Sequence, residues 1–126
     1  MKWVLIVEGE RFRIEAIDLS DERPEAGCPA RDFIDGLPEP TRKRMVAILN
    51  RHASHGPILN QQVSRDLDDG ICEFKTPQGA RVLWFYPGGP RLTVLTHGFQ
   101  KGSRLRAEIV RAKAYRAAYL RAFPAR

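Results

Sequence analysis

Three extended, apolar segments in the second half of the chain constrain the fold more than any other feature. They span residues 70–76, 81–86 and 92–99, and only Pro77-Gln78-Gly79 and Pro87-Gly88-Gly89-Pro90 separate them. Both connections are short and rich in residues that form tight turns, so the three segments predict an antiparallel meander. Since all three are apolar on both faces, we expect one face of the sheet to be covered and the other to carry the function.

Two more extended segments, residues 2–7 and 11–17, precede the meander. Glu8-Gly9-Glu10 between them allows a hairpin turn. Residues 11–17 alternate charged and apolar side chains, which is the pattern of a half-buried strand. Residues 1–10 are therefore expected to be an extra strand or an N-terminal extension.

Helical patterns occupy three stretches of the remaining chain. A short helix opens at Cys28-Pro29, because proline is well suited to the first position of a helix. A second helix is expected over about residues 39–54, a loop from there to residue 69, and a C-terminal helix from about Ser103 to Ala122. The 126-residue length fits one domain, residues 1–126. The order of the predicted elements is that of an α+β domain.

Several classes of protein are disfavoured by the composition. The longest apolar run is five residues, against the roughly 20 that a membrane-spanning helix needs, and the first residues do not resemble a signal peptide. Cys28 and Cys72 are isolated and are expected to be reduced thiols. His52, His55 and His97 match no metal-binding spacing. We therefore expect a cytoplasmic protein with no membrane association, no metal and no cofactor.

Charge is distributed unevenly along the chain. Residues 1–40 contain five basic and ten acidic side chains, whereas residues 74–126 contain eleven basic side chains and a single acidic one, Glu108. Such an excess of positive charge is self-repulsive unless an anionic partner is nearby. Nucleic acid, an acidic protein or a membrane surface could each be that partner.

A cationic group on and just after the meander is the main chemical signal; its members are Lys75, Arg81, His97, Lys101 and Arg104. Such a group suits cleavage of an RNA phosphodiester by transesterification. Arg and Lys stabilise the extra negative charge of the phosphorane without a metal, and a His can transfer protons near neutral pH. Tyr86 could stack on an unpaired base.

Each of these residues also has an ordinary structural interpretation. His97 stands near a strand end and could simply bond a carbonyl, and Arg81 could be the ion-pair partner of Glu73. Lysines 75 and 101 and Arg104 could be solvated surface residues. His52 and His55 fall in the last turn of a predicted helix, where they could interact with the helix dipole.

Five patches in a fixed order resemble the RelE/HigB-type toxins of bacterial type II toxin–antitoxin systems, in particular their phage-derived-protein-like subgroup. Residues 28–38 look like the first helix of that family, and residues 67–75 (LDDGICEFK) are similar to its L-x-D-G-[IL]-x-E-[LF]-[RK] strand. Residues 81–85 (RVLWF) and 93–101 (TVLTHGFQK) look like the next two strands, and Glu108-Ile109 and Ala112 like the last helix. The resemblance covers roughly residues 11–120.

The resemblance implies a fold, a function and a site. The fold is α+β, with a small antiparallel sheet, two N-terminal helices packed on it and a C-terminal helix. Such toxins cut mRNA, usually on the ribosome, without a metal, and a cognate antitoxin neutralises them. On this chain it implies Arg81 and Lys75 as phosphate contacts, His97 as the acid–base group and Lys101 as a further charge. Gly102 replaces the second Lys of the family pattern, with Arg104 as a substitute, and Lys75 replaces the commoner Arg.

Two alternatives remain open at this point. A ParE-like member of the same superfamily would inhibit DNA gyrase by protein contact and perform no chemistry. A non-catalytic module of phage origin would bind nucleic acid or a partner, and its RNA binding would depend on salt without cleavage.

Overall fold

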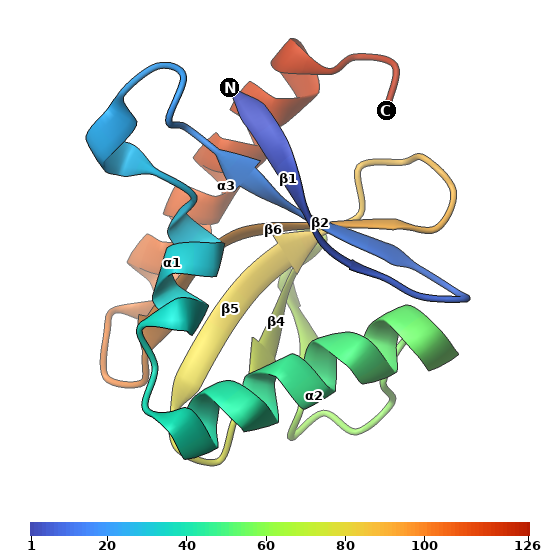
Figure 1. The fold of residues 1–126 in the computed structure, drawn as a ribbon, viewed down its shortest axis with the longest axis vertical. Coiled ribbons are helices and arrows are strands. Elements are labelled where there is room, and N and C mark those ends of the chain that lie inside the picture. Colours follow the sequence, from blue (N-terminus) through green and yellow to red (C-terminus); the bar gives the residue numbers. More distant parts are fainter.

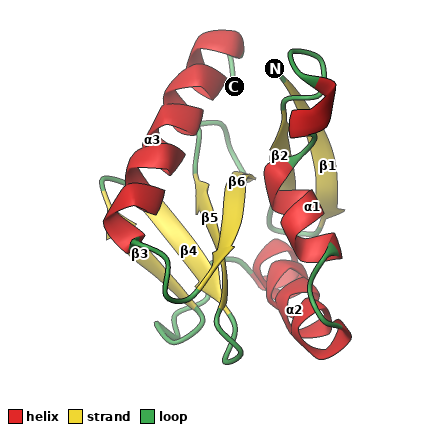
Figure 2. Ribbon diagram, turned by 90° about the vertical axis from the view of Figure 1, so that its left-hand side faces the viewer, coloured by secondary structure: helices red, strands yellow, loops and turns green.

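The computed structural model describes all 126 residues, and it contains one six-stranded sheet with helices on both faces (Figures 1 and 2). The strands are β1 (Lys2–Glu8), β2 (Arg13–Asp18), β3 (Ser64–Asp68), β4 (Ile71–Lys75), β5 (Ala80–Phe85) and β6 (Leu92–Gln100). The helices are α1 (Pro29–Asp35), α2 (Glu39–His55) and α3 (Leu105–Ala122), with a short 3₁₀ turn, η1 (Pro24–Ala26), before α1. The predicted α+β fold is confirmed.

The strands are arranged in the order β1-β2-β6-β5-β4-β3. Strands β4, β5 and β6 pair antiparallel, which confirms the predicted meander, and β1 and β2 form the predicted hairpin. The hairpin and the meander join where β2 pairs with β6 in parallel, with Arg13 beside Leu92 and Ala16 beside Leu95. This parallel pair connects segments almost 80 residues apart, so it was not visible in local sequence patterns.

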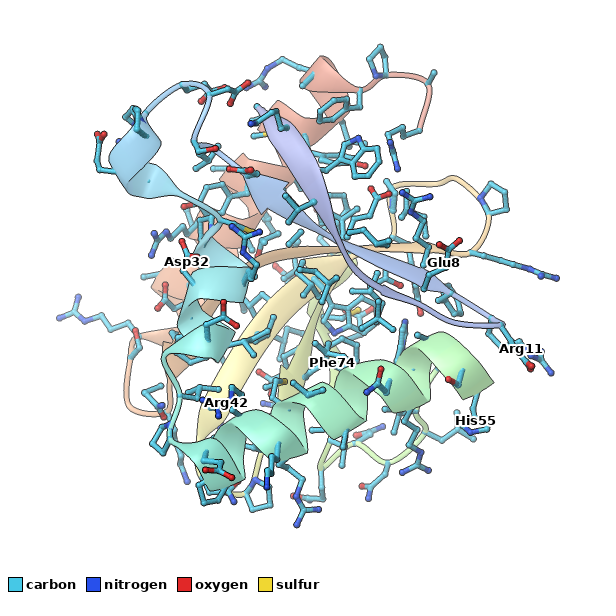
Figure 3. All side chains as sticks on the ribbon, viewed as in Figure 1. Glu8, Arg11, Asp32, Arg42, His55 and Phe74 are labelled. Carbon is cyan, nitrogen blue, oxygen red and sulfur yellow. The ribbon has the colours of Figure 1, made fainter.

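Helices α1 and α2 cover one face of the sheet (Figure 2). Their apolar side chains pack with alternate residues of the strands, and Phe74 lies in the interior between β4 and α2, whereas Arg11 and His55 point outward (Figure 3). Helix α1 approaches β6 closely at Gly98, where an added Cβ would overlap the ring of Phe33. Glycine is needed there because any side chain would overlap the aromatic ring.

Helix α3 covers the opposite face, which corrects the prediction that this face would be free to carry the function (Figure 2). Tyr119 and Ala112 of α3 are completely buried against Leu83, Phe85 and Val94 of the meander. The meander is apolar on both faces because both faces are covered.

Two strands differ from the prediction. Strand β2 is not half-buried: it lies inside the sheet, and even its charged Glu15 is fully buried, held by Arg13 at 2.8 Å and Arg126 at 2.6 Å. Residues 64–68, expected to be part of a loop, form the edge strand β3. Their sequence, SRDLD, is polar because an edge strand is largely solvated, so it lacks the apolar alternation that signals a strand.

Candidate functional site

A cavity of about 530 Å³ lies at the end of the sheet where β4 turns into β5. It is bordered by helix α2, by Asn60, Gln62 and Val63, and by the β4–β5 turn. Five basic residues and no acidic residue line it: Arg44, Arg51, Lys75, Arg81 and Lys101. We call it the cationic cavity. Three of the residues predicted from sequence are thus brought together, because Lys75 and Arg81 are direct partners in the β4–β5 ladder and Lys101 follows β6.

The buried carboxylate of Glu73 organises this end of the sheet. Its side chain has no exposed surface, and three cations surround it: Arg65 at 3.0 Å, Arg81 at 3.5 Å and Lys75 at 4.0 Å. The predicted ion pair of Arg81 with Glu73 is confirmed, and Arg81 also lines the cationic cavity, while its contact with phosphate stays a prediction. One carboxylate cannot neutralise three cations, so the cluster keeps a net positive charge.

Lys75 and Arg81 both pair with Glu73 and line the cavity, and both are largely buried. The side chains of Lys75 and Arg81 are only 18% and 17% exposed. In such surroundings, Lys and Arg interact more strongly with an anion than they would in bulk water. Because Glu73 also restrains them, little reorganisation would be needed for these two side chains to bind an anion.

His97 does not line the cationic cavity. It is paired with Leu83 of β5 and lies on the same face of the sheet as Leu83 and Phe99, which α3 covers, so its ring is 1% exposed. Its Nε2 lies 3.3 Å from Oε1 of Glu108, its Nδ1 lies 3.1 Å from Oγ1 of Thr96, and Ser103 donates a hydrogen bond to Glu108 at 2.8 Å. His97 therefore connects the sheet to the first turn of α3 through the carboxylate of Glu108, and its side chain bonds no carbonyl.

The environment of His97 also favours the neutral imidazole. Burial lowers its pKa below the usual value, and the nearby charge of Arg111 lowers it further, against the opposing effect of Glu108. The acid–base role expected for His97 stays a prediction, and its position outside the cavity does not support that role.

The other two residues expected to bind RNA also lie outside the cationic cavity. Arg104 is exposed just before α3. Tyr86 follows the opposite end of β5, is 44% exposed, and stacks on Phe12 with 5.5 Å between ring centroids. Arg81 and Tyr86 therefore lie at opposite ends of β5 and cannot belong to one compact site.

His52 is not the charged helix-end residue that the sequence suggested. Its ring is completely buried, packs against Phe12, Phe74 and Trp84, and places Nε2 at 2.9 Å from Oγ1 of Thr93. Burial lowers the pKa of His52 to about 4. It is therefore neutral at physiological pH and does not compensate the helix dipole with charge.

Sequence reasoning missed four residues of the cavity. Arg44 and Arg51 lie in the predicted second helix but were not among the candidate site residues, and Asn60 and Gln62 fell within a predicted loop. The spacing of the two arginines could have found them, because residues seven apart lie on the same side of a helix. No local signal identifies Asn60 or Gln62.

Two further findings concern metal and membrane binding. No three His, Cys, Asp or Glu side chains gather closely enough to hold a metal ion. None of the helices combines the length and the apolar character needed to cross a bilayer.

Comparison with known proteins gives a family. No curated protein matches the chain. A family model described as "Phage derived protein Gp49-like (DUF891)" matches residues 32–123, more than two thirds of the chain. The match contains all five basic residues of the cationic cavity, as well as α2, the meander and α3. It confirms the phage-derived part of the predicted resemblance, while the assignment to RelE/HigB toxins stays a prediction. The chain belongs to the family of Gp49-like phage-derived proteins.

Proposed function

We propose that this protein is the toxin of a type II toxin–antitoxin system and that it cleaves mRNA, on the ribosome, without a metal ion. The observation that carries the proposal is the cationic cavity, in which five basic side chains converge and no acidic side chain lines the wall. The family and the sequence resemblance to RelE/HigB-type toxins support it.

The chemistry follows from the charges in the cavity. The 2′-oxygen of a ribose attacks the adjacent phosphorus, the bond to the 5′-oxygen breaks, and a 2′,3′-cyclic phosphate and a 5′-hydroxyl form. The phosphorane between them carries more negative charge than the substrate, so Lys75 and Arg81 bind it more tightly than they bind the starting phosphodiester. The 2′-hydroxyl releases its proton to water. An ammonium, for which Lys75 and Lys101 are the candidates, supplies one to the 5′-oxygen.

This proposal assigns no proton transfer to His97, since its imidazole lies outside the cavity and is held by Glu108. Its role is to position α3 on the sheet.

The partners in the proposal follow from the same charge. A ribosome-bound transcript presents phosphates to the cavity. Residues 74–126 contain only one acidic side chain. A cognate antitoxin with acidic segments would compensate the positive charge of this region and neutralise the toxin. The proposed site of action is the cytoplasm.

Substitution of Arg81 by Ala is the direct test. Arg81→Ala removes a cavity cation but leaves Glu73 paired with Arg65 and Lys75, so the fold should persist. On induction in bacteria, wild-type protein should arrest growth and generate new 5′ ends in mRNA, and Arg81→Ala should do neither. Arg121→Ala is the matched control, because Arg121 is exposed on α3 and does not line the cavity. Full toxicity and unchanged cleavage by Arg81→Ala would refute the proposal.

The same experiment separates the alternatives. Growth arrest with inhibited gyrase and intact mRNA would indicate a ParE-like inhibitor. Salt-dependent RNA binding by purified protein, with no cleavage on ribosomes, would indicate a non-catalytic module. Protein that has been stripped with EDTA should cleave mRNA on programmed ribosomes as fast as untreated protein does, with Mg²⁺ as the only added metal ion. A requirement for a metal other than Mg²⁺ would contradict the mechanism.

A further inference from the structure

We propose that Arg44 and Arg51 of α2 bind phosphates next to the one that reacts, so that the cationic cavity takes a run of phosphates from one RNA strand rather than a single phosphate. The inference rests on the proposed function in one respect, that the ligand is RNA. It adds which cations hold the strand and which act on the reacting phosphate.

The cavity carries more positive charge than one phosphate can balance. Its wall contains five basic residues and no acidic residue. A phosphodiester has a single negative charge, and the phosphorane of the proposed reaction has only one more. The cations left over would repel one another in a site that held one phosphate. A nucleic-acid strand relieves this repulsion, because it brings several regularly spaced negative charges on one chain.

The five cations fall into two groups according to their partners. Lys75 and Arg81 are cross-strand partners, are largely buried and share the carboxylate of Glu73. The other three are exposed and form no ion pair within the chain: Arg44, Arg51 and Lys101. These three can therefore take up an anion without breaking an existing ion pair.

Helix α2 places the two arginines along one wall of the cavity. They are seven residues apart, and Ala47 and Ile48 between them line the cavity as well. Residues at this spacing lie on one side of a helix and span two turns, about 10 Å along the axis. This length exceeds the width of one phosphate group, so the pair can bind two phosphates at once. The buried Met45 and Leu49 anchor α2 in the core.

This arrangement separates binding of the strand from the chemical step. A cation on a neighbouring phosphate interacts with it equally before and during the reaction, because the charge of that phosphate does not change. Its removal should therefore raise KM and leave kcat unchanged. Removal of Arg81, which acts on the reacting phosphate in the proposed mechanism, should lower kcat instead.

The salt dependence of RNA binding by the purified full chain, without ribosomes, tests the inference. Fluorescence anisotropy would give the affinity for labelled hexauridylate over a series of NaCl concentrations. Logarithmic affinity falls with logarithmic salt concentration by about 0.7 for each phosphate of a single strand that is neutralised, so three contacted phosphates predict a slope of about −2. Arg44→Gln and Arg51→Gln should each make the slope shallower by about 0.7. Each should also weaken binding by about 2- to 10-fold.

Two controls make the result specific. Lys43→Gln removes a cation from the same helix, but Lys43 lies outside the cavity and pairs with Glu39 at 3.0 Å, so its slope should equal that of wild type. A labelled hexaglutamate peptide has a similar charge on a different backbone and should bind more weakly than the RNA. The inference is overturned by any of four results: no RNA binding, a wild-type slope near −0.7, an unchanged slope in either arginine variant, or an equal change in Lys43→Gln. Equally tight binding of hexaglutamate would also overturn it and would indicate an acidic protein as the ligand.

The outcomes also separate the inference from the proposed function. A shallower slope in both arginine variants supports the inference even if no mRNA is cleaved, in which case only the nuclease proposal fails. Cleavage that depends on Arg81, together with unchanged slopes in the arginine variants, supports the nuclease and refutes the inference. If the arginine variants lose cleavage on ribosomes but bind the isolated strand as wild type does, the arginines contact ribosomal RNA and the inference is wrong. A lower kcat at unchanged KM would place them at the reacting phosphate and would refute it as well.

Discussion

The buried imidazole of His52 should make the stability of the protein fall as the pH is lowered from neutral. The ring lies among aromatic side chains with no exposed surface, and Nδ1 has no hydrogen-bond partner, so nothing compensates a positive charge there. Protonation therefore opposes folding.

The size of this effect follows from the pKa of the folded state. Burial lowers the pKa of His52 from 6.5 to about 4, so the unfolded chain takes up a proton at a pH where the folded chain does not. The stabilisation from a neutral His52 is complete above the unfolded pKa and is lost as the pH falls through 6.5 toward 4. The full effect is about 3 kcal/mol, and between about pH 7.5 and pH 5 it amounts to about 2 kcal/mol.

The measurement is urea denaturation at these two pH values for wild type and for His52→Gln. Glutamine can still bond the hydroxyl of Thr93 but does not titrate. The substitution also removes aromatic packing and so lowers stability at both pH values. The readout is therefore the change in the free energy of unfolding between the two pH values. Other buried groups also contribute to the pH dependence, since burial lowers the pKa of His97 and raises that of Glu15. Wild type and His52→Gln share these groups, so the comparison between the two proteins isolates His52. If His52→Gln loses as much stability on acidification as wild type does, the reasoning is wrong.

Three further predictions concern the sheet and its buried charges. His97→Gln should keep mRNA cleavage, because the imidazole lies outside the cavity, and loss of cleavage with unchanged thermal stability would restore its acid–base role. Gly98→Ala should lower the free energy of unfolding by about 1–3 kcal/mol in urea, because the new methyl group overlaps Phe33, and a neutral result would mean that α1 shifts freely. Glu73→Gln should cost about 3 kcal/mol in the same assay by leaving three cations without their carboxylate, and a stabilised variant would contradict the assigned pairing.

Much of the fold could be predicted from local sequence because its elements are defined by local chemistry. Turn residues at 77–79 and 87–90 separate the strands of the meander, and Pro29 and Gly56 mark the start of one helix and the end of another. The grouping of Lys75 with Arg81 follows from the same information, because a tight turn between two strands makes their facing residues partners.

The remaining features depend on contacts between distant segments. The parallel pairing of β2 with β6 buries Glu15, and α3 covers the face that was expected to be free. The same helix encloses His97, while α2 brings Arg44 and Arg51 to the cavity from the other side of the sheet.

The sequence by itself therefore determined five of the six strands, the three α-helices and three of the cavity cations, since short turns and helical periodicity act over a few residues. Tertiary structure alone decided that His97 is enclosed, that Glu73 gathers three cations and that two amides join the cavity. A side chain is buried or exposed according to which distant surface packs over it, and no pattern along the chain records that choice.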